Sequence, residues 1–192
     1  MTNKIYDCIT FFDENLLTNL RFEILKNVVD YFIVCESKFD HKRRKKEINF
    51  SLINDELKNK VKHIIINEPF PSKLNNWGIE EFQREKLFEG IKEADPEDFI
   101  MYSDSDEIPN PEKFKEFHLS NSKYGAFEQL FFYYKLNFMN VSQKEWYGSK
   151  ICQKKNLKTP NWLREYKIKQ YPWWRLDKKE NIKIIHNGGW HF

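Results

Sequence analysis

Short apolar runs alternate with amphipathic stretches along the first half of the chain. The runs are rich in strand-forming residues and cover positions 4–12, 31–37, 61–67 and 98–103. Apolar residues recur at helical spacing from Leu16 to Val28 and again between Trp77 and Ala94. This alternation predicts an α/β protein with a mainly parallel, Rossmann-like sheet flanked by helices.

The pattern changes after the fourth predicted strand. Residues 110–118 predict a short helix, and residues 124–138 predict an aromatic-rich strand region. The stretch from 141 to 192 predicts strands and loops without a clear period. Because no repeat or flexible linker divides the sequence, we expect a single domain over residues 1–192.

Composition narrows the class of protein. Of the 192 residues, 40% are apolar, which is ample for a hydrophobic core, and the net charge of +3 argues against a nucleic-acid partner. No apolar run reaches the ~18 residues that a membrane span needs. The scattered cysteines, Cys8, Cys35 and Cys152, favour a reducing compartment. We therefore expect a cytoplasmic protein without a membrane span.

Three acidic side chains, Asp104, Asp106 and Glu107, directly follow the fourth predicted strand. Ligands of parallel sheets bind outside the carboxyl ends of the strands, and crowded like charges call for a cation. On an extended backbone Asp104 and Asp106 point the same way, so they can bridge Mg²⁺ or Mn²⁺. The alternative is a turn cluster, since Asp, Ser and Pro are ordinary turn residues.

Phosphate recognition has to rely on metal and side chains, because the sequence contains no glycine-rich phosphate loop. Arg84, on the helix predicted before the acidic segment, can reach a diphosphate or form a surface pair with Glu80 or Glu81. The basic run HKRRKK at 41–46 predicts a solvated loop whose charges add little to stability, or else an anion-binding loop.

The C-terminal stretch NGGWHF places His191 beside the chain end. The histidine is a candidate metal ligand or acid/base group, with a structural role as the alternative. Chain ends normally fray. If His191 binds metal, we expect the tail to become ordered when metal and ligand bind.

Several segments, taken together, resemble glycosyltransferase family 17, which includes the enzyme that adds the bisecting N-acetylglucosamine to the core mannose of N-glycans. They are IYDCITFFDENLLTNLRFEIL, VVDYFIVCES, NWGIEEFQREKLFEGI, IMYSDSDEIPNPEKF, TPNWLREY and NGGWHF. The resemblance implies a GT-A fold and inverting transfer of N-acetylglucosamine or a related hexose from a UDP-linked donor to a glycan or glycoconjugate acceptor. Asp104 and Asp106 match the D-x-D motif of the family, Glu107 the acid after it, and His191 the histidine of its GWH motif.

The resemblance also suggests roles for individual residues. Asp104, Asp106 and His191 are the expected ligands of Mn²⁺ or Mg²⁺. The expected donor-binding residues are Trp77, Arg84, Asp104, Ser105, Asp106 and Glu107.

Inverting transfer needs a general base. Glu128 is the preferred candidate, with Glu165 and Asp177 as alternatives. Four aromatic residues can stack on sugar rings or pack in the core, namely Trp162, Tyr166, Trp173 and Trp174.

Two other functions remain open at this point. The same carboxylates would serve a metal-dependent phosphohydrolase. A domain that kept the fold but lost its acceptor half would bind sugars or polyanions without catalysis.

Overall fold

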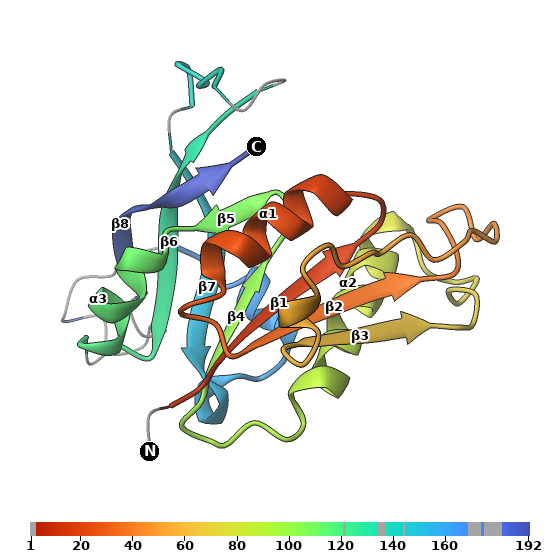
Figure 1. Ribbon diagram of the computed structural model, residues 1–192, viewed down its shortest axis with the longest axis horizontal. Coiled ribbons are helices and arrows are strands. Elements are labelled where there is room, and N and C mark those ends of the chain that lie inside the picture. The colour runs from red at the N-terminus through yellow and green to blue at the C-terminus, as the bar shows by residue number, and fades with distance from the viewer. Residues whose placement is uncertain (1–2, 121, 134–136, 144, 169–173, 175–181) are drawn as a thin grey trace.

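The computed structural model describes residues 3–120, 122–133, 137–143, 145–168, 174 and 182–192 (Figure 1). Its α-helices are α1 (Asn15–Leu25), α2 (Asn76–Lys86), α3 (Phe114–His118) and α4 (Pro160–Arg164). Its strands are β1 (Ile5–Phe11), β2 (Tyr31–Ser37), β3 (Val61–Ile66), β4 (Phe99–Ser103), β5 (Glu107–Pro109), β6 (Tyr124–Phe131), β7 (Glu145–Gln153) and β8 (Lys183–His191). Short 3₁₀ helices cover Asp55–Leu57, Leu87–Ile91, Pro111–Lys113 and Lys154–Asn156.

The described strands form one mixed sheet in the order β3-β2-β1-β4-β7-β6-β8-β5. The first four strands of this order are parallel, and β6 is parallel to β8. Strand β7 runs antiparallel to both β4 and β6, and β5 runs antiparallel to β8. The predicted α/β class is confirmed, with four of the seven pairings among the described strands parallel.

Alternating side chains of the central strands pack in two hydrophobic cores, one on each face of the sheet. In β2, Phe32 and Val34 pack in the core that contains Phe22 of α1. Ile33 and Cys35 point to the opposite core, because successive side chains of a strand face opposite ways. That second core contains residues of α2, so α1 and α2 cover opposite faces of the sheet (Figure 1).

The four strands predicted in the first half are confirmed as β1 to β4, and the two predicted helices as α1 and α2. The second helix is shorter than predicted, because its α-helical part ends at Lys86 and continues as a 3₁₀ helix to Ile91. In α1 only part of the leucine pattern marks the buried face: Leu25 is fully buried, but Leu16 is 75% exposed, whereas Arg21 is fully buried. The reason lies in a buried ion pair of Arg21 described below.

The C-terminal stretch forms a strand, and the ordering of this tail by metal and ligand stays a prediction. Strand β8 lies between β6 and β5, and His191 pairs with Phe131 on one side and Glu107 on the other. Gly189 has a φ of +136°, and a Cβ atom there would collide with the carbonyl oxygen of Ile108. The glycine therefore allows β8 to approach β5, which fixes His191 next to the acidic segment.

The sequence argued against a membrane span and against disulfide bonds, and the structure bears on both. In the part of the chain that the structure describes, no helix is both long and apolar enough to cross a membrane. Cys8, Cys35 and Cys152 are buried free thiols.

Candidate active site

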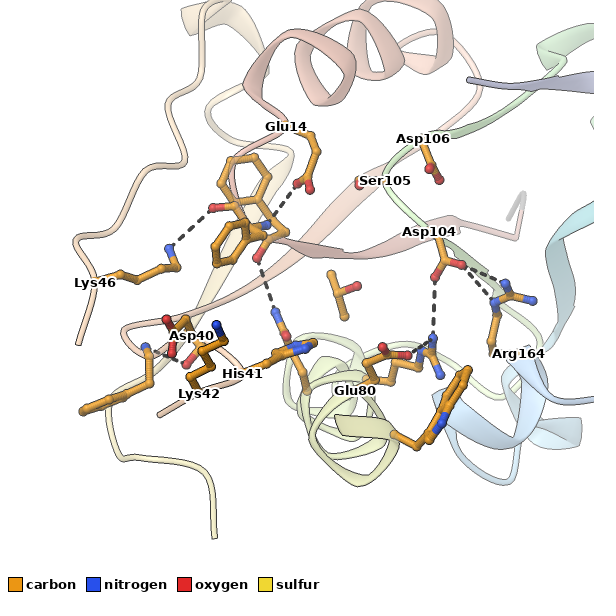
Figure 2. A pocket seen from close by; sticks show the side chains of 18 of the residues that line it. Glu14, Asp40, His41, Lys42, Lys46, Glu80, Asp104, Ser105, Asp106 and Arg164 are labelled. Carbon is orange, nitrogen blue, oxygen red and sulfur yellow. Dashed lines mark hydrogen bonds and ion pairs between the residues drawn. The ribbon is translucent and has the colours of Figure 1, made fainter. Parts of the chain in front are cut away.

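A cavity of about 780 Å³ opens where β1, β2 and β4 end. Its walls come from the ends of these strands, the loop after β2, one face of α2, the acidic segment after β4, and single residues of β7, β8 and α4. Asp104, Asp106 and Arg164 lie on one side of the cavity, across from His41 and Lys42 (Figure 2). This is the sheet edge at which the sequence placed the ligand site.

Asp104, the first acid of the D-x-D segment, has partners on both carboxylate oxygens. The Tyr102 hydroxyl donates to Oδ1 at 3.0 Å, and Arg164 donates to Oδ2 from Nη2 at 2.7 Å and from Nε at 3.2 Å. Burial alone would raise the pKa of Asp104, but Arg164, Arg84 and the Tyr102 hydroxyl together outweigh it and the pKa is lowered. Asp104 is therefore an ionised carboxylate already committed to protein donors.

Glu107, the last acid of the segment, is fully buried and does not line the cavity. Its carboxylate accepts hydrogen bonds from the indole of Trp146 at 2.6 Å and from the backbone N–H of Asp104 at 2.9 Å. Burial raises its pKa, and the nearby charge of Asp104 adds to the rise. Glu107 therefore stabilises the acidic turn through these hydrogen bonds and does not face a sugar donor in the cavity.

Asp106 is the acid whose carboxylate remains available. Its side chain is 37% exposed and lines the cavity, and its Oδ2 lies 3.5 Å from Nε2 of His191. The ring of His191 packs against Phe131, whose centroid lies 4.4 Å away, and Trp146 at 4.6 Å, and these two rings also contact each other at 5.6 Å. Two aromatic faces and the strand pairing of β8 therefore aim the imidazole at Asp106.

A buried arginine on α1 anchors the acidic segment from below. Arg21 binds the carboxylate of Asp7 through Nε and Nη2, both at 2.6 Å. It also donates to the hydroxyl of Ser103 at 2.8 Å and to the backbone carbonyl of Glu107. One guanidinium thus holds both ends of the turn that carries Asp104 and Asp106.

Sequence reasoning missed this anchor, although a signal was present. Asp7 lies within the apolar run of the first strand, and Arg21 lies within the apolar repeat of the first helix. Charged residues are rarely buried unless they are paired. Two opposite charges in two predicted core elements therefore indicated a buried pair.

The residues at Asp106 fit a divalent cation only in part. Within the described residues, no group of three or more His, Cys, Asp and Glu side chains is arranged to hold a metal ion. Asp106 and His191 can supply one oxygen and one nitrogen, and the buried Nδ1 of His191 has no hydrogen-bond partner. Mg²⁺ commonly takes one or two carboxylates and completes its shell with substrate phosphates and water. The pair therefore suits a cation that is shared with a phosphorylated ligand.

The other predicted donor-binding residues, Trp77, Arg84 and Ser105, line the same cavity. Trp77 is 76% exposed. Arg84 donates to Glu80 at 3.2 Å, so the predicted surface pair exists, and it also reaches the Tyr102 hydroxyl at 3.1 Å. Burial would lower the pKa of Arg84, but Tyr102 and Asp104 outweigh it and raise the pKa. Arg84 therefore belongs to the network around Asp104.

Glu128, the predicted base, does not line this cavity. Its carboxylate accepts from the Tyr147 hydroxyl at 3.0 Å and lies 2.7 Å from Nδ1 of His186. Glu165 approaches Arg84 at 3.9 Å but also lies outside the cavity lining. Asp177 is outside the described residues.

The aromatic candidates divide between core and surface. Trp162 and Tyr166 pack with Tyr124, at ring distances of 5.3 and 4.6 Å, so the core alternative holds for them. Trp174 is 63% exposed. Trp173 lies outside the described residues. Trp146, which sequence reasoning did not select, is the tryptophan that joins Trp77 in the cavity wall.

The basic run at 41–46 is not simply a solvated loop. Arg43 has a φ of 62° and donates to the carbonyls of Phe70, Pro71, Ser72 and Leu74. Lys46 binds the buried carboxylate of Glu36 at 2.6 Å. These contacts favour a structural role for Arg43 and Lys46, while the small effect of the basic run on stability stays a prediction. His41, Lys42, Arg44 and Lys46 contribute to the cavity wall.

The sheet, with its parallel half ending at a cavity lined by both acidic and basic side chains, defines an α/β protein. Residues 1–167 match the model of glycosyltransferase family 17, and the chain belongs to this family. The GWH motif lies beyond the matched residues. No curated protein gives a significant match.

Solved structures show distant likeness. A crystal structure of S. aureus TarS 1–349 shares 15% identity at a TM-score of 0.45, covering 73% of this chain and 38% of that chain. A 4-diphosphocytidyl-2C-methyl-D-erythritol synthase shares 13% identity at 0.44, covering 80% and 77%. A glycosyltransferase involved in glycosylation of the major capsid of PBCV-1 shares 14% identity at 0.41, covering 94% and 80%.

Proposed function

We propose that this glycosyltransferase is metal-dependent and inverting. In this proposal it moves N-acetylglucosamine or a related hexose from a UDP-linked donor to a glycan or glycoconjugate acceptor, with an N-glycan as the family's example. The observation that carries the proposal is the pairing of Asp106 with His191 in the cavity wall of a family 17 chain. The free thiols of Cys8, Cys35 and Cys152 support the cytoplasm as the compartment.

Asp106 and His191 would hold Mn²⁺ or Mg²⁺, with nitrogen ligation favouring Mn²⁺. The cation would neutralise the charge that develops on the departing diphosphate. Asp104 would keep its bonds to Arg164 and Tyr102 and so fix the direction of the turn, instead of serving as the direct ligand predicted from D-x-D. Trp77, Arg84 and Ser105 would contact the donor from the cavity wall.

The acceptor hydroxyl must lose its proton to a base within hydrogen-bond reach. Glu128 would have to act from outside the cavity, where both of its oxygens are already engaged. Glu14 and Glu80 line the cavity, and each uses one carboxylate oxygen in the contacts of the described residues. We therefore add Glu14 and Glu80 to the candidates.

Calorimetry of UDP binding with and without Mn²⁺ tests the proposal. The wild type should bind UDP more tightly when Mn²⁺ is present, and Asp106→Asn should lose most of that gain, because it removes the ionic ligand while keeping the side-chain shape. Equal metal-dependent affinity in both proteins would contradict the assignment. With a UDP-sugar as substrate, release of UDP supports transfer, whereas release of UMP and a sugar 1-phosphate would support the phosphohydrolase alternative.

A further inference from the structure

A buried glutamine of α2 reaches the cavity from the face of the helix that packs on the sheet. Gln83 and Ile79 are the buried residues of α2, and they lie one helical turn apart on the same face. Gln83 is only 8% exposed, yet it lines the cavity. Its amide is therefore largely removed from bulk water but open to a ligand in the cavity.

The orientation of this amide follows from its partners. Its nitrogen lies 3.0 Å from the carbonyl oxygen of Cys35 in β2 and 3.3 Å from that of Phe11 at the end of β1. Both partners are acceptors, so the amide NH₂ group faces them and both of its N–H bonds are used. None of the described residues donates a hydrogen bond to Oε1. Gln83 therefore offers the cavity one hydrogen-bond acceptor whose direction is fixed.

The residue after Phe11 supplies an exposed aromatic ring in the same cavity. Phe12 lines the cavity and is 51% exposed, and the ammonium of Lys46 lies 5.3 Å from the centre of its ring. Aromatic side chains stack on nucleobases of every kind, because every base has a π face. Phe12 can therefore supply affinity for a base without selectivity, whereas Gln83 can distinguish the edge of that base.

The position of Gln83 relative to Asp106 also suits a nucleotide. The amide of Gln83 binds β1 and β2, whereas the acidic segment follows β4, and β1 is the strand between β2 and β4. Neighbouring strands are about 4.8 Å apart, so roughly 7 Å or more separates the two places along the edge of the sheet. A nucleotide whose phosphates share a cation with Asp106 can therefore extend its base toward Gln83.

We propose that Gln83 selects the base of the donor by accepting a hydrogen bond from the N3–H group of uracil, while Phe12 stacks on the ring. This inference rests on the proposed function, in which the donor is UDP-linked. Uracil carries a donor at N3, whereas cytosine carries a lone pair there. Cytosine would bring two acceptors together and leave both without a hydrogen bond.

The contacts of the amide prevent it from adapting to cytosine. If the amide turned over to offer its N–H groups to the base, its oxygen would face the carbonyls of Phe11 and Cys35. That exchange replaces two hydrogen bonds with contacts between acceptors. Gln83 is therefore a specificity-determining residue, with its selectivity fixed by the ends of β1 and β2.

Calorimetry of UDP and CDP binding, both with Mn²⁺ present, tests this selectivity. The measured quantity is the ratio of the CDP and UDP dissociation constants, because a general loss of structure or of metal affects both nucleotides alike. Gln83→Met removes the acceptor and the donors. Gln83→Lys removes the acceptor but keeps a donor for the two carbonyls. Phe12→Ser is the matched control, since stacking does not distinguish the edges of bases.

We expect the wild type to bind UDP at least roughly tenfold more tightly than CDP, because CDP leaves a buried acceptor unpaired. In both Gln83 variants this preference should fall below about threefold, since the acceptor is gone. Phe12→Ser should weaken the binding of UDP and of CDP by a similar factor of roughly ten, and so keep the wild-type ratio.

A wild-type ratio in both Gln83 variants would overturn the role of Gln83 while the proposed function stands. A wild type that binds CDP as tightly as UDP would have the same consequence. A wild type without metal-dependent UDP binding would contradict the proposed function, and the role of Gln83 with it. If Gln83→Met does not fold, the ratio measured for Gln83→Lys decides the outcome.

Discussion

Nη2 of Arg164 lies 2.7 Å from Oδ2 of Asp104, while Asp106, two residues on, faces His191 across 3.5 Å. The two aspartates of the D-x-D segment therefore have different roles. The charge of Asp104 is balanced inside the protein, and that of Asp106 is left for a ligand.

This difference predicts opposite phenotypes for two matched substitutions. Asp104→Asn should lower the free energy of unfolding by about 1–2 kcal/mol, because it leaves the partly buried Arg164 without its closest anion. Asp106→Asn should change stability by less than about 0.5 kcal/mol. Urea denaturation measures both.

For ligand binding we expect the opposite ranking, with Asp106→Asn the more damaging of the two substitutions. Asp104→Asn should keep more of the metal-dependent gain in UDP affinity than Asp106→Asn, since Asp104 contacts protein donors on both oxygens. If Asp104→Asn is the more damaging variant in calorimetry, then Arg164 must release Asp104 when the ligand binds. The separate role given to Asp104 would be wrong in that case.

The buried pair of Arg21 and Asp7 predicts a strong coupling. Arg21→Met should destabilise the protein by about 3–5 kcal/mol, because Asp7 keeps its charge in the core without a partner. Adding Asp7→Leu should recover part of this loss. A double-mutant cycle by urea denaturation measures the coupling. Additive effects of the two substitutions would show that the pair does not act as a unit.

The clamp formed by Arg43 predicts a contrast within one basic loop. Arg43→Ala should cost about 1–3 kcal/mol of stability, because the carbonyls of the 70–74 loop lose a charged donor. Lys45→Ala is the matched control, since Lys45 is exposed, and it should change stability by less than about 0.5 kcal/mol. Similar melting temperatures for the two variants would contradict the structural role of Arg43.

The sequence alone predicted the parallel half of the fold because β1 to β4 are apolar runs, with amphipathic helices between β1 and β2 and between β3 and β4. Such a pattern follows directly from which side chains are buried. It also predicted that the acidic segment lies at the carboxyl end of β4. It did not predict which acid faces the ligand. That depends on contacts far apart in the chain, such as Arg164 with Asp104 and Trp146 with Glu107, separated by 60 and 39 residues.

In the C-terminal half, too, the sequence did not predict contacts between segments that are far apart in the chain. Glu128 was the preferred base because it follows the acidic segment after β4 at a suitable distance along the chain. In the sheet, however, its oxygens are bound by Tyr147 and His186. His191 seemed exposed to fraying because of its position in the chain, but pairing of β8 with β5 and β6 holds it in place. Such pairings join distant segments, and local periodicity carries no record of them.

The buried cysteines predict how stability depends on alkaline pH. Burial raises the pKa of Cys152 to about 12, from an ordinary value of 9.0. Above about pH 9 the unfolded chain loses this proton while the folded chain keeps it, so the folded state binds more protons and stability falls as pH rises. The stabilising contribution is complete below about pH 9 and is lost between about pH 9 and about pH 12.

Comparison of the wild type with Cys152→Ala isolates this effect from the other groups that titrate in the same range. Below about pH 9 the variant should be less stable by a constant amount, which reflects the lost side chain. Above it, the difference should shrink by up to about 1.4 kcal/mol per pH unit, because only the wild type has this thiol to ionise on unfolding. Ile151→Val is the control, since Ile151 is the equally buried neighbour and has no proton to lose. A constant difference between wild type and Cys152→Ala at every pH would show that the thiol ionises equally in both states.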